Sequence, residues 1–174
     1  MTLKDVLQEF LNKVGWKDEI QHDDAGNTNW IITDFPIRSQ NYRLKLLADE
    51  PREQLTIFLI SPISIPKHRA KEAAFVLNFI NANLALGDLV LEEDGMVLYQ
   101  WVIDVGGATA APHQIATLIN AAAGAFDEMR VAAIGAAAFS KQPAEEIVDD
   151  YKKALFELIK KMQNEKAKEA PSSL

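Results

Sequence analysis

The sequence has 174 residues, of which 48% are hydrophobic and 25% are charged, which suits one globular domain with a real core and argues against a disordered chain. Acidic residues outnumber basic ones by 25 to 18, and the net charge of -7 argues against nucleic acid as a partner, because most of the surface would repel phosphate. Cysteine is absent, which excludes disulfides, thiolate metal ligands and cysteine nucleophiles.

Neither end of the chain nor its middle reads as a membrane segment. The first ten residues, MTLKDVLQEF, carry charges where a signal peptide needs an apolar core. The longest uncharged run, 105–126, is interrupted by Pro112, His113 and Asn120, so it would make a poor membrane span. We therefore expect a cytoplasmic protein with no membrane partner.

The first predicted helix covers residues 3–14, with Thr2 as its N-cap and Gly15 at its end. Residues 22–29, HDDAGNTN, indicate a turn, and WIITDF at 30–35 indicates a strand. Residues 42–49 alternate between apolar and polar side chains, which is typical of a strand with one buried face.

After a turn at Pro51, the strand QLTIFLI at 54–60 is apolar on both faces. This pattern predicts a central strand that is covered on both sides. A second helix is expected from Pro66 to about Leu84, with Gly87 in left-handed geometry after it.

Two further strands are expected at 88–93 and 96–105, joined by Asp94-Gly95, a strong hairpin signal. One alanine-rich helix is then expected from Pro112 to about residue 139. A break at 140–143, SKQP, separates it from a last helix at about 143–167.

The predicted fold class is therefore α+β, an antiparallel sheet covered by helices. The order of elements is α-β-β-β-α-β-β-α plus an extra C-terminal helix. We expect one domain at 1–140, an appended helix at 141–168 that packs on the domain or on a partner, and a disordered tail at 169–174.

Asparagines stand out in the second helix. Its apolar stripe includes Leu77, Ile80 and Leu84; Asn78 flanks that stripe and Asn81 falls inside it. Because a buried amide must be paired, we expect Asn81 to tie the helix end to the sheet. Recognition of a ligand by these amides is the alternative.

Two apolar surfaces need a cover. Phe75 and Phe79 lie on the side of the second helix opposite its stripe, and the segment VAAIGAAAF at 131–139 is apolar nearly all round. The last helix has a narrow seam with coiled-coil spacing, formed by Val148, Tyr151, Leu155, Leu158 and Met162. This seam is expected to close a helical hairpin within the chain, or to meet a partner protein or second subunit.

The segment 77–105 resembles the YbjN-type family of bacterial sensory transduction regulators. The resemblance rests on Leu77-Asn78, Asn81-Ala82, Gly87 and the turn Asp94-Gly95, preceded by paired strands and a proline-started helix in 41–66. It implies a fold like that of type III secretion chaperones, whose members often form homodimers, and it implies no enzyme or cofactor. The last helix has no counterpart in the family pattern.

Catalytic and metal-binding patterns are weak. His22, His68 and His113 lie in different elements without a second ligand at helical spacing, so no metal site is predicted. The acids at 92–94 crowd a turn tip, which offers neither the burial nor the partner that acid–base work needs. We therefore expect neither an enzyme nor a cofactor.

Two functional hypotheses remain open. The first is a non-enzymatic module, chaperone-like or regulatory, that binds a protein partner or itself through Phe75, Phe79 and the seam of the last helix. The second is a small-ligand sensor with an apolar pocket between sheet and helices, lined by Phe58, Ile60, Tyr99 and Trp101. Asn78, Asn81, Gly87, Asp94 and Gly95 are expected to be structural.

Overall fold

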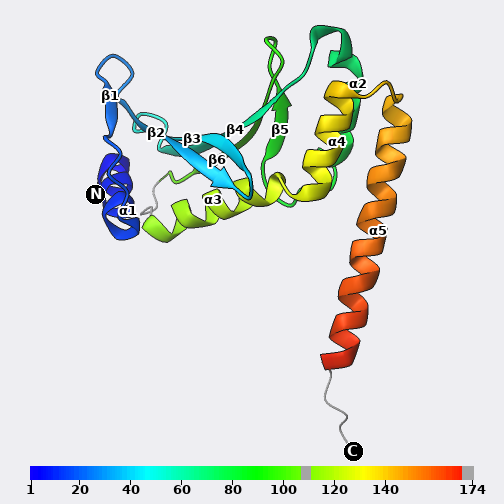
Figure 1. Ribbon diagram of the computed structural model, residues 1–174. Helices are drawn as coiled ribbons and strands as arrows, with labels where there is room; N and C mark the ends of the chain where they lie inside the picture. The colour runs from blue at the N-terminus through cyan, green and yellow to red at the C-terminus, as the bar shows by residue number, and fades with distance from the viewer. Residues whose placement is uncertain (107–110, 170–174) are drawn as a thin grey trace, which may run out of the picture.

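The computed structural model describes residues 1–106 and 111–169 (Figure 1). Within them, six strands form one antiparallel sheet in the order β1-β2-β3-β4-β6-β5. The strands are β1 (Gln21–Asp23), β2 (Thr28–Ile37), β3 (Gln40–Asp49), β4 (Gln54–Ser64), β5 (Asp88–Leu91) and β6 (Met96–Asp104). The α-helices of the same residues are α1 (Leu3–Val14), α2 (Ala70–Asn81), α3 (Pro112–Ala125), α4 (Glu128–Phe139) and α5 (Ala144–Glu169), and a short 3-10 helix, η1 (Lys67–Arg69), precedes α2. The predicted α+β class, with an antiparallel sheet covered by helices, is confirmed.

The core lies on one face of the sheet. Leu46 of β3 pairs with Ile31 of β2 and Ile57 of β4, so all three side chains point to the same side, and each is at most 2% exposed. Helices α1 and α3 pack against this side and against each other (Figure 1). Segments far apart in the sequence therefore close the core together.

The start of α1 is held by two sets of hydrogen bonds. Thr2 and Asp5 form a capping box, in which Asp5 N–H donates to Thr2 Oγ1 at 3.1 Å and Thr2 N–H donates to Asp5 Oδ2 at 2.8 Å. The hydrogen bonds from Thr2 lower the pKa of Asp5. The Glu50 carboxylate, just after β3, accepts from the N–H groups of Leu3 and Lys4 at 3.1 and 2.8 Å.

Helices α2, α4 and α5 form a second group beside the β5 edge of the sheet (Figure 1). α4 and α5 run antiparallel through the connection at 140–143. Arg69 fixes that connection to the start of α2, because its Nε donates to the Ala137 carbonyl at 3.0 Å and its Nη2 to the Gln142 carbonyl at 2.8 Å.

The predicted order of elements misses one strand. The segment expected to be only a turn contains β1, whose Gln21, His22 and Asp23 pair with the beginning of β2. His22 Nδ1 and Asn29 Oδ1, which face each other across this pair, lie 2.9 Å apart in a hydrogen bond. Only the tip is a turn, and there Asn27 takes the left-handed φ of 45°.

The alanine-rich segment is two helices, where one was predicted. α3 ends before Phe126, and Asp127 is the N-cap of α4, with its Oδ1 accepting from Arg130 N–H at 2.8 Å. Phe126 is buried at the break and packs against Tyr42, with ring centroids 4.9 Å apart and the ring planes tilted by 47°. The break lets α3 follow the sheet while α4 packs against α2.

Two boundaries also differ. α2 ends at Asn81, three residues earlier than predicted, and Gly87 belongs to the turn before β5 with a φ of 65°. α5 continues to Glu169, and residues 170–174 of the expected tail lie outside the described residues.

Candidate protein-interaction surfaces

The second face of the sheet is not packed against a described helix. Trp30 pairs with Leu47, Lys45 with Phe58, and Thr56 with Val102, so these residues share the face opposite the core. We call this surface the open face. Its apolar members are Trp30, Ile32, Leu47, Phe58, Ile60, Val90, Leu98 and Val102, and none of them belongs to the core cluster.

The open face is apolar but only partly shielded by its own neighbours. Ile32 and Val102 keep 42% and 39% of their surface exposed, whereas Leu98 is buried. The prediction that β4 is covered on both sides is therefore wrong: an antiparallel sheet can leave one face to solvent, and here that face is unusually rich in large apolar side chains.

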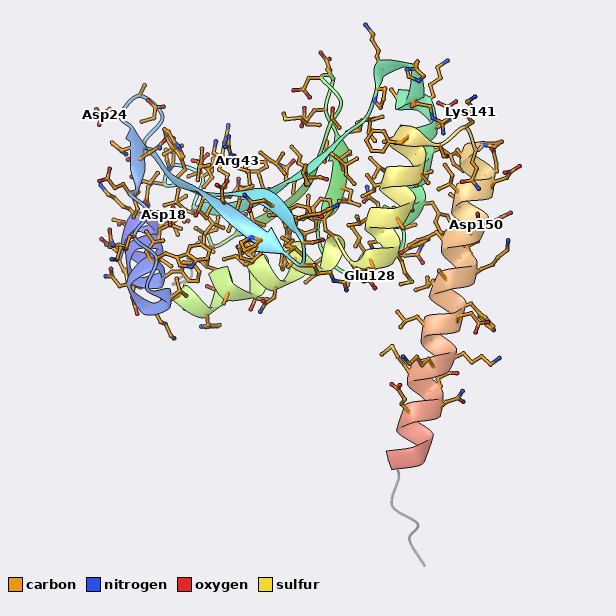
Figure 2. All side chains as sticks on the ribbon, viewed as in Figure 1. Asp18, Asp24, Arg43, Glu128, Lys141 and Asp150 are labelled. Atoms are coloured by element: carbon orange, nitrogen blue, oxygen red, sulfur yellow. The ribbon has the colours of Figure 1, made fainter. Side chains whose placement is uncertain are left out.

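A cation sits at the middle of this face. Lys45 Nζ lies 5.6 Å from the ring centre of Trp30 and 6.0 Å from that of Phe58, within the range of cation–π attraction. Arg43, two residues along β3, is exposed on the same face, and Figure 2 shows its side chain projecting away from α3. The centre of the open face therefore combines aromatic surface with the positive charge of Lys45, and Arg43 faces Asp34 across the β2–β3 pair.

Two hollows lie at the ends of the open face. One, of about 350 Å³, is bordered by Arg43, Ile60 and Pro62. The other, of about 420 Å³, is bordered by Val90 and Val102. The open face is therefore uneven, with two hollows of a size that admits side chains.

The four residues predicted to line one ligand pocket do not lie together. Phe58 and Ile60 point to the open face, whereas Tyr99 and Trp101 pair with Leu59 and Ile57 on the core face. The register pairs Phe58 with Gln100, so the neighbours of Gln100 in β6, Tyr99 and Trp101, point to the opposite face from Phe58.

The last helix divides into a packed half and a free half. Ala144, Ile147, Val148 and Tyr151 are buried against α2 and α4, and Leu155 is partly buried. From 156 to 165 every residue is exposed, and this part of α5 extends beyond the rest of the domain (Figure 1).

The expected interaction residues therefore have different surroundings. Phe79 packs edge-on against Tyr151, with ring centroids 6.1 Å apart, so α5 of the same chain covers this part of α2. Phe75 remains 50% exposed beside the start of α5. Leu158 and Met162, at 41% and 50% exposure, are free on the distal half of α5.

An apolar cleft of about 380 Å³ separates α4 from α5. Its floor and walls are mostly small or apolar side chains, and Glu128, Gln142 and Asp150 supply its polar edge (Figure 2). The apolar residues that line this α4–α5 cleft are Met129, Ala132, Ala133, Ala136, Ile147, Tyr151 and Ala154.

Two polar atoms beside the cleft are buried without a hydrogen-bond partner, the Tyr151 hydroxyl and Arg130 Nε. Burial raises the pKa of Tyr151, and the nearby Arg130 charge opposes that rise. Arg130 is otherwise held by Nη1, which donates to the Gly124 carbonyl at 2.9 Å and to the Asp127 carboxylate at 2.6 Å.

The residues expected to be structural occupy turns and links. Asn81 hydrogen bonds to both backbone groups of Leu89, and Asn78 is exposed on α2. Gly87 and Gly95 have φ of 65° and 90°, where a side chain would be strained. Asp94 Oδ1 accepts from Met96 N–H at 3.0 Å and shapes the hairpin turn.

Among residues 1–106 and 111–169, no group of three or more histidine or acidic side chains is arranged to hold a metal ion. His22 instead contacts Asp24, with Nε2 and Oδ1 2.9 Å apart. In the same described ranges, no helix is both long and apolar enough to cross a membrane.

The chain matches the YbjN family, described as "Putative bacterial sensory transduction regulator", over residues 3–134. The match ends within α4, so α5 lies beyond it. No curated protein matches the chain. It is similar to a chain in the structure of the HopA1-SchA chaperone–effector complex, with 20% identity, a TM-score of 0.45, and coverage of 68% of this chain and 85% of that one. It is also similar to YbjN from E. coli, with 13% identity, a TM-score of 0.46, and coverage of 76% and 89%.

Proposed function

The chain belongs to the YbjN family, and from that premise we propose that it is a non-enzymatic interaction module, chaperone-like or regulatory, that binds another protein. The observation that carries the proposal is the open face of the sheet. Large apolar side chains are gathered there on neighbouring strands without a helix over them, which is typical of a surface completed by a partner.

The open face also indicates what such a partner would present. Burying one of its Phe, Ile or Val side chains would contribute roughly 1.5–3 kcal/mol, so a partner with apolar side chains gains most. Lys45 adds a positive charge beside Trp30 and Phe58, whereas the charge of Arg43 faces Asp34 across the β2–β3 pair. Lys45 therefore favours an acidic residue among those apolar side chains. The proposed partner is thus a protein segment that is apolar with at least one acid.

Site-specific photo-crosslinking in cells would test this proposal. A photoreactive residue would replace Ile32 or Val102 on the open face, and a control would carry it at Phe139, which is 72% exposed but lies on α4. A partner that crosslinks from both open-face positions and not from the control would identify the segment it uses.

The captured segment would then be synthesised as a peptide and its binding measured. We expect the Ile32→Glu and Val102→Glu double variant to bind about tenfold or more weakly than the wild type, since it loses apolar burial and adds negative charge that repels the acidic residue of the segment. Phe139→Glu should bind unchanged. A peptide that binds all three proteins equally, or no crosslinked protein at all, would refute binding at the open face.

A second candidate function is sensing of a small ligand. A cleft of about 250 Å³ lies between the β2–β3 turn and α4, and Tyr42 and Phe126 line it. This cleft lies between sheet and helices, as the sensor hypothesis requires. A metabolite panel would test it: a true ligand raises the melting temperature of the wild type and not that of a variant with Ser39→Trp, which fills this cleft and lies away from the α4–α5 cleft.

A further inference from the structure

One apolar line runs along α5 from its packed half into its free half. Ile147, Tyr151, Ala154, Leu158 and Met162 are spaced by three or four residues, so they lie on one side of the helix. The first three line the α4–α5 cleft, and the last two are exposed beyond it. The cleft and the free apolar side chains thus form one continuous surface.

We propose that two copies of the chain associate through this surface, with their α5 helices antiparallel. The free end of each α5 would lie in the α4–α5 cleft of the other copy. The arrangement is closed by a two-fold axis near Phe156, so the same residues contribute on both sides. It does not use the open face, and it therefore goes beyond the proposed function.

The free half of α5 is long enough to fill the α4–α5 cleft of a second copy. At about 1.5 Å per residue, the free stretch 156–165 is roughly 15 Å long, enough to cover the cleft-lining stretch 147–154 of α5, which spans roughly 10 Å. The opposite wall of the cleft is formed by Ala132, Ala133 and Ala136, whose small side chains allow a third helix to approach closely. Leu158 and Met162 are the side chains that would enter.

The charges favour a second copy over an unrelated apolar helix. An axis between Leu155 and Phe156 places Lys161 of one copy beside Asp150, on the polar edge of the cleft of the other. This pair has opposite signs. Within one chain, Asp150 and Lys161 are eleven residues apart, roughly 16 Å along the helix, so they cannot pair there.

Sedimentation velocity over a concentration series would measure the association of the full chain. The wild type is expected to be a dimer, and Leu158→Glu with Met162→Glu should raise the dimer Kd roughly a hundredfold. Both residues are exposed in the single copy, so the variant should fold normally. The matched control, Phe156→Glu with Gln163→Glu, adds the same charge on the opposite side of the helix from Leu158 and Met162. Although Phe156 is level with the axis, both control side chains point away from the second copy, so the dimer should stay intact.

Charge exchange would test the antiparallel arrangement itself. Asp150→Lys alone and Lys161→Glu alone should each weaken the dimer by about tenfold, because each creates two like-charge contacts across the axis. An equimolar mixture of the two single variants should form a heterodimer of wild-type strength, since both contacts then join opposite charges.

Three results would overturn the proposal. They are a wild type that stays monomeric at every concentration, a control variant that dissociates as readily as the Leu158 and Met162 variant, and a mixture no stronger than its components. None of them bears on crosslinking from Ile32 or Val102, so failure of the dimer and failure of the open face can be told apart.

Discussion

The side-chain amide of Asn81, the last residue of α2, forms two hydrogen bonds with the backbone of Leu89 in β5. Its Nδ2 donates to the Leu89 carbonyl at 2.9 Å, and its Oδ1 accepts from the Leu89 N–H at 2.8 Å. A single amide thereby satisfies both backbone groups of one residue in an edge strand and joins the helix to the sheet.

Replacing Asn81 by Ala should lower the free energy of unfolding by about 1–3 kcal/mol, because both Leu89 groups lose their partner in a partly buried site. Asn78→Ala is the matched control on the same helix, and it should change stability by less than about 0.5 kcal/mol because Asn78 is exposed. Urea unfolding measures both. Equal effects for the two variants would mean that the link to Leu89 does not stabilise the fold.

Gly87→Ala should destabilise the protein by about 2 kcal/mol or more. Gly87 has a φ of 65°, and a Cβ there would lie 2.4 Å from the ring of Tyr99, so backbone strain and overlap act together. Gly135→Ala offers the contrast within α4, because nothing lies within 4 Å of its Cβ, and it should stabilise by about 0.5–1 kcal/mol. Thermal melts of the two variants should therefore shift in opposite directions.

Tyr151→Phe should leave stability unchanged or raise it by up to about 1 kcal/mol, since it removes a buried hydroxyl that has no hydrogen-bond partner. Tyr99→Phe removes a hydroxyl that donates to the Leu86 carbonyl at 2.9 Å, and it should cost about 1 kcal/mol. Guanidinium unfolding of both variants checks the difference in sign. If Tyr151→Phe lowers the free energy of unfolding as much as Tyr99→Phe does, the Tyr151 hydroxyl must have a hydrogen-bond partner after all.

Stability should also fall in strong alkali. Burial raises the pKa of Tyr99 to about 12, with a smaller contribution from Asp88, so between pH 10 and 12 the folded state keeps a proton that the unfolded state releases. Each pH unit in this window should cost up to about 1.4 kcal/mol for this residue. Below pH 10 its contribution is fully present. Urea unfolding at pH 9, 10 and 11 measures how the free energy of unfolding falls with pH. This fall should be smaller for Tyr99→Phe than for the wild type. An equal fall in both proteins would show that Tyr99 does not cause it.

The sequence predicted best where a short pattern acts alone. The alternation of residues 42–49 and the Asp94-Gly95 turn depend on neighbours in sequence, and both are found as predicted. The break at Phe126 was missed because Ile119, Phe126 and Ala133 keep the helical spacing across it, and only Asp127 marked the second start. β1 was missed because its pairing with β2 lies in polar residues without apolar alternation.

The open face was missed for a different reason. A strand that is apolar on both faces shows that both faces prefer apolar contacts, but it does not show whether the same chain supplies them. Phe58 and Ile60 have no cover among the described helices, and Trp30 and Val102 extend that surface on neighbouring strands. Whether a face is covered depends on where the helices pack, and the described helices pack on the core face or against α2.

The capping of α1 has a consequence for the order in which the chain becomes fixed. A lone helix of 12 residues is marginal in water, and the Glu50 carboxylate that holds the amides of Leu3 and Lys4 comes 47 and 46 residues later in the chain. The helix partner α3 is later still, beginning at Pro112. α1 leaves the ribosome before the end of β3 and before α3, and it must wait for both, so this helix is secured well after its own synthesis.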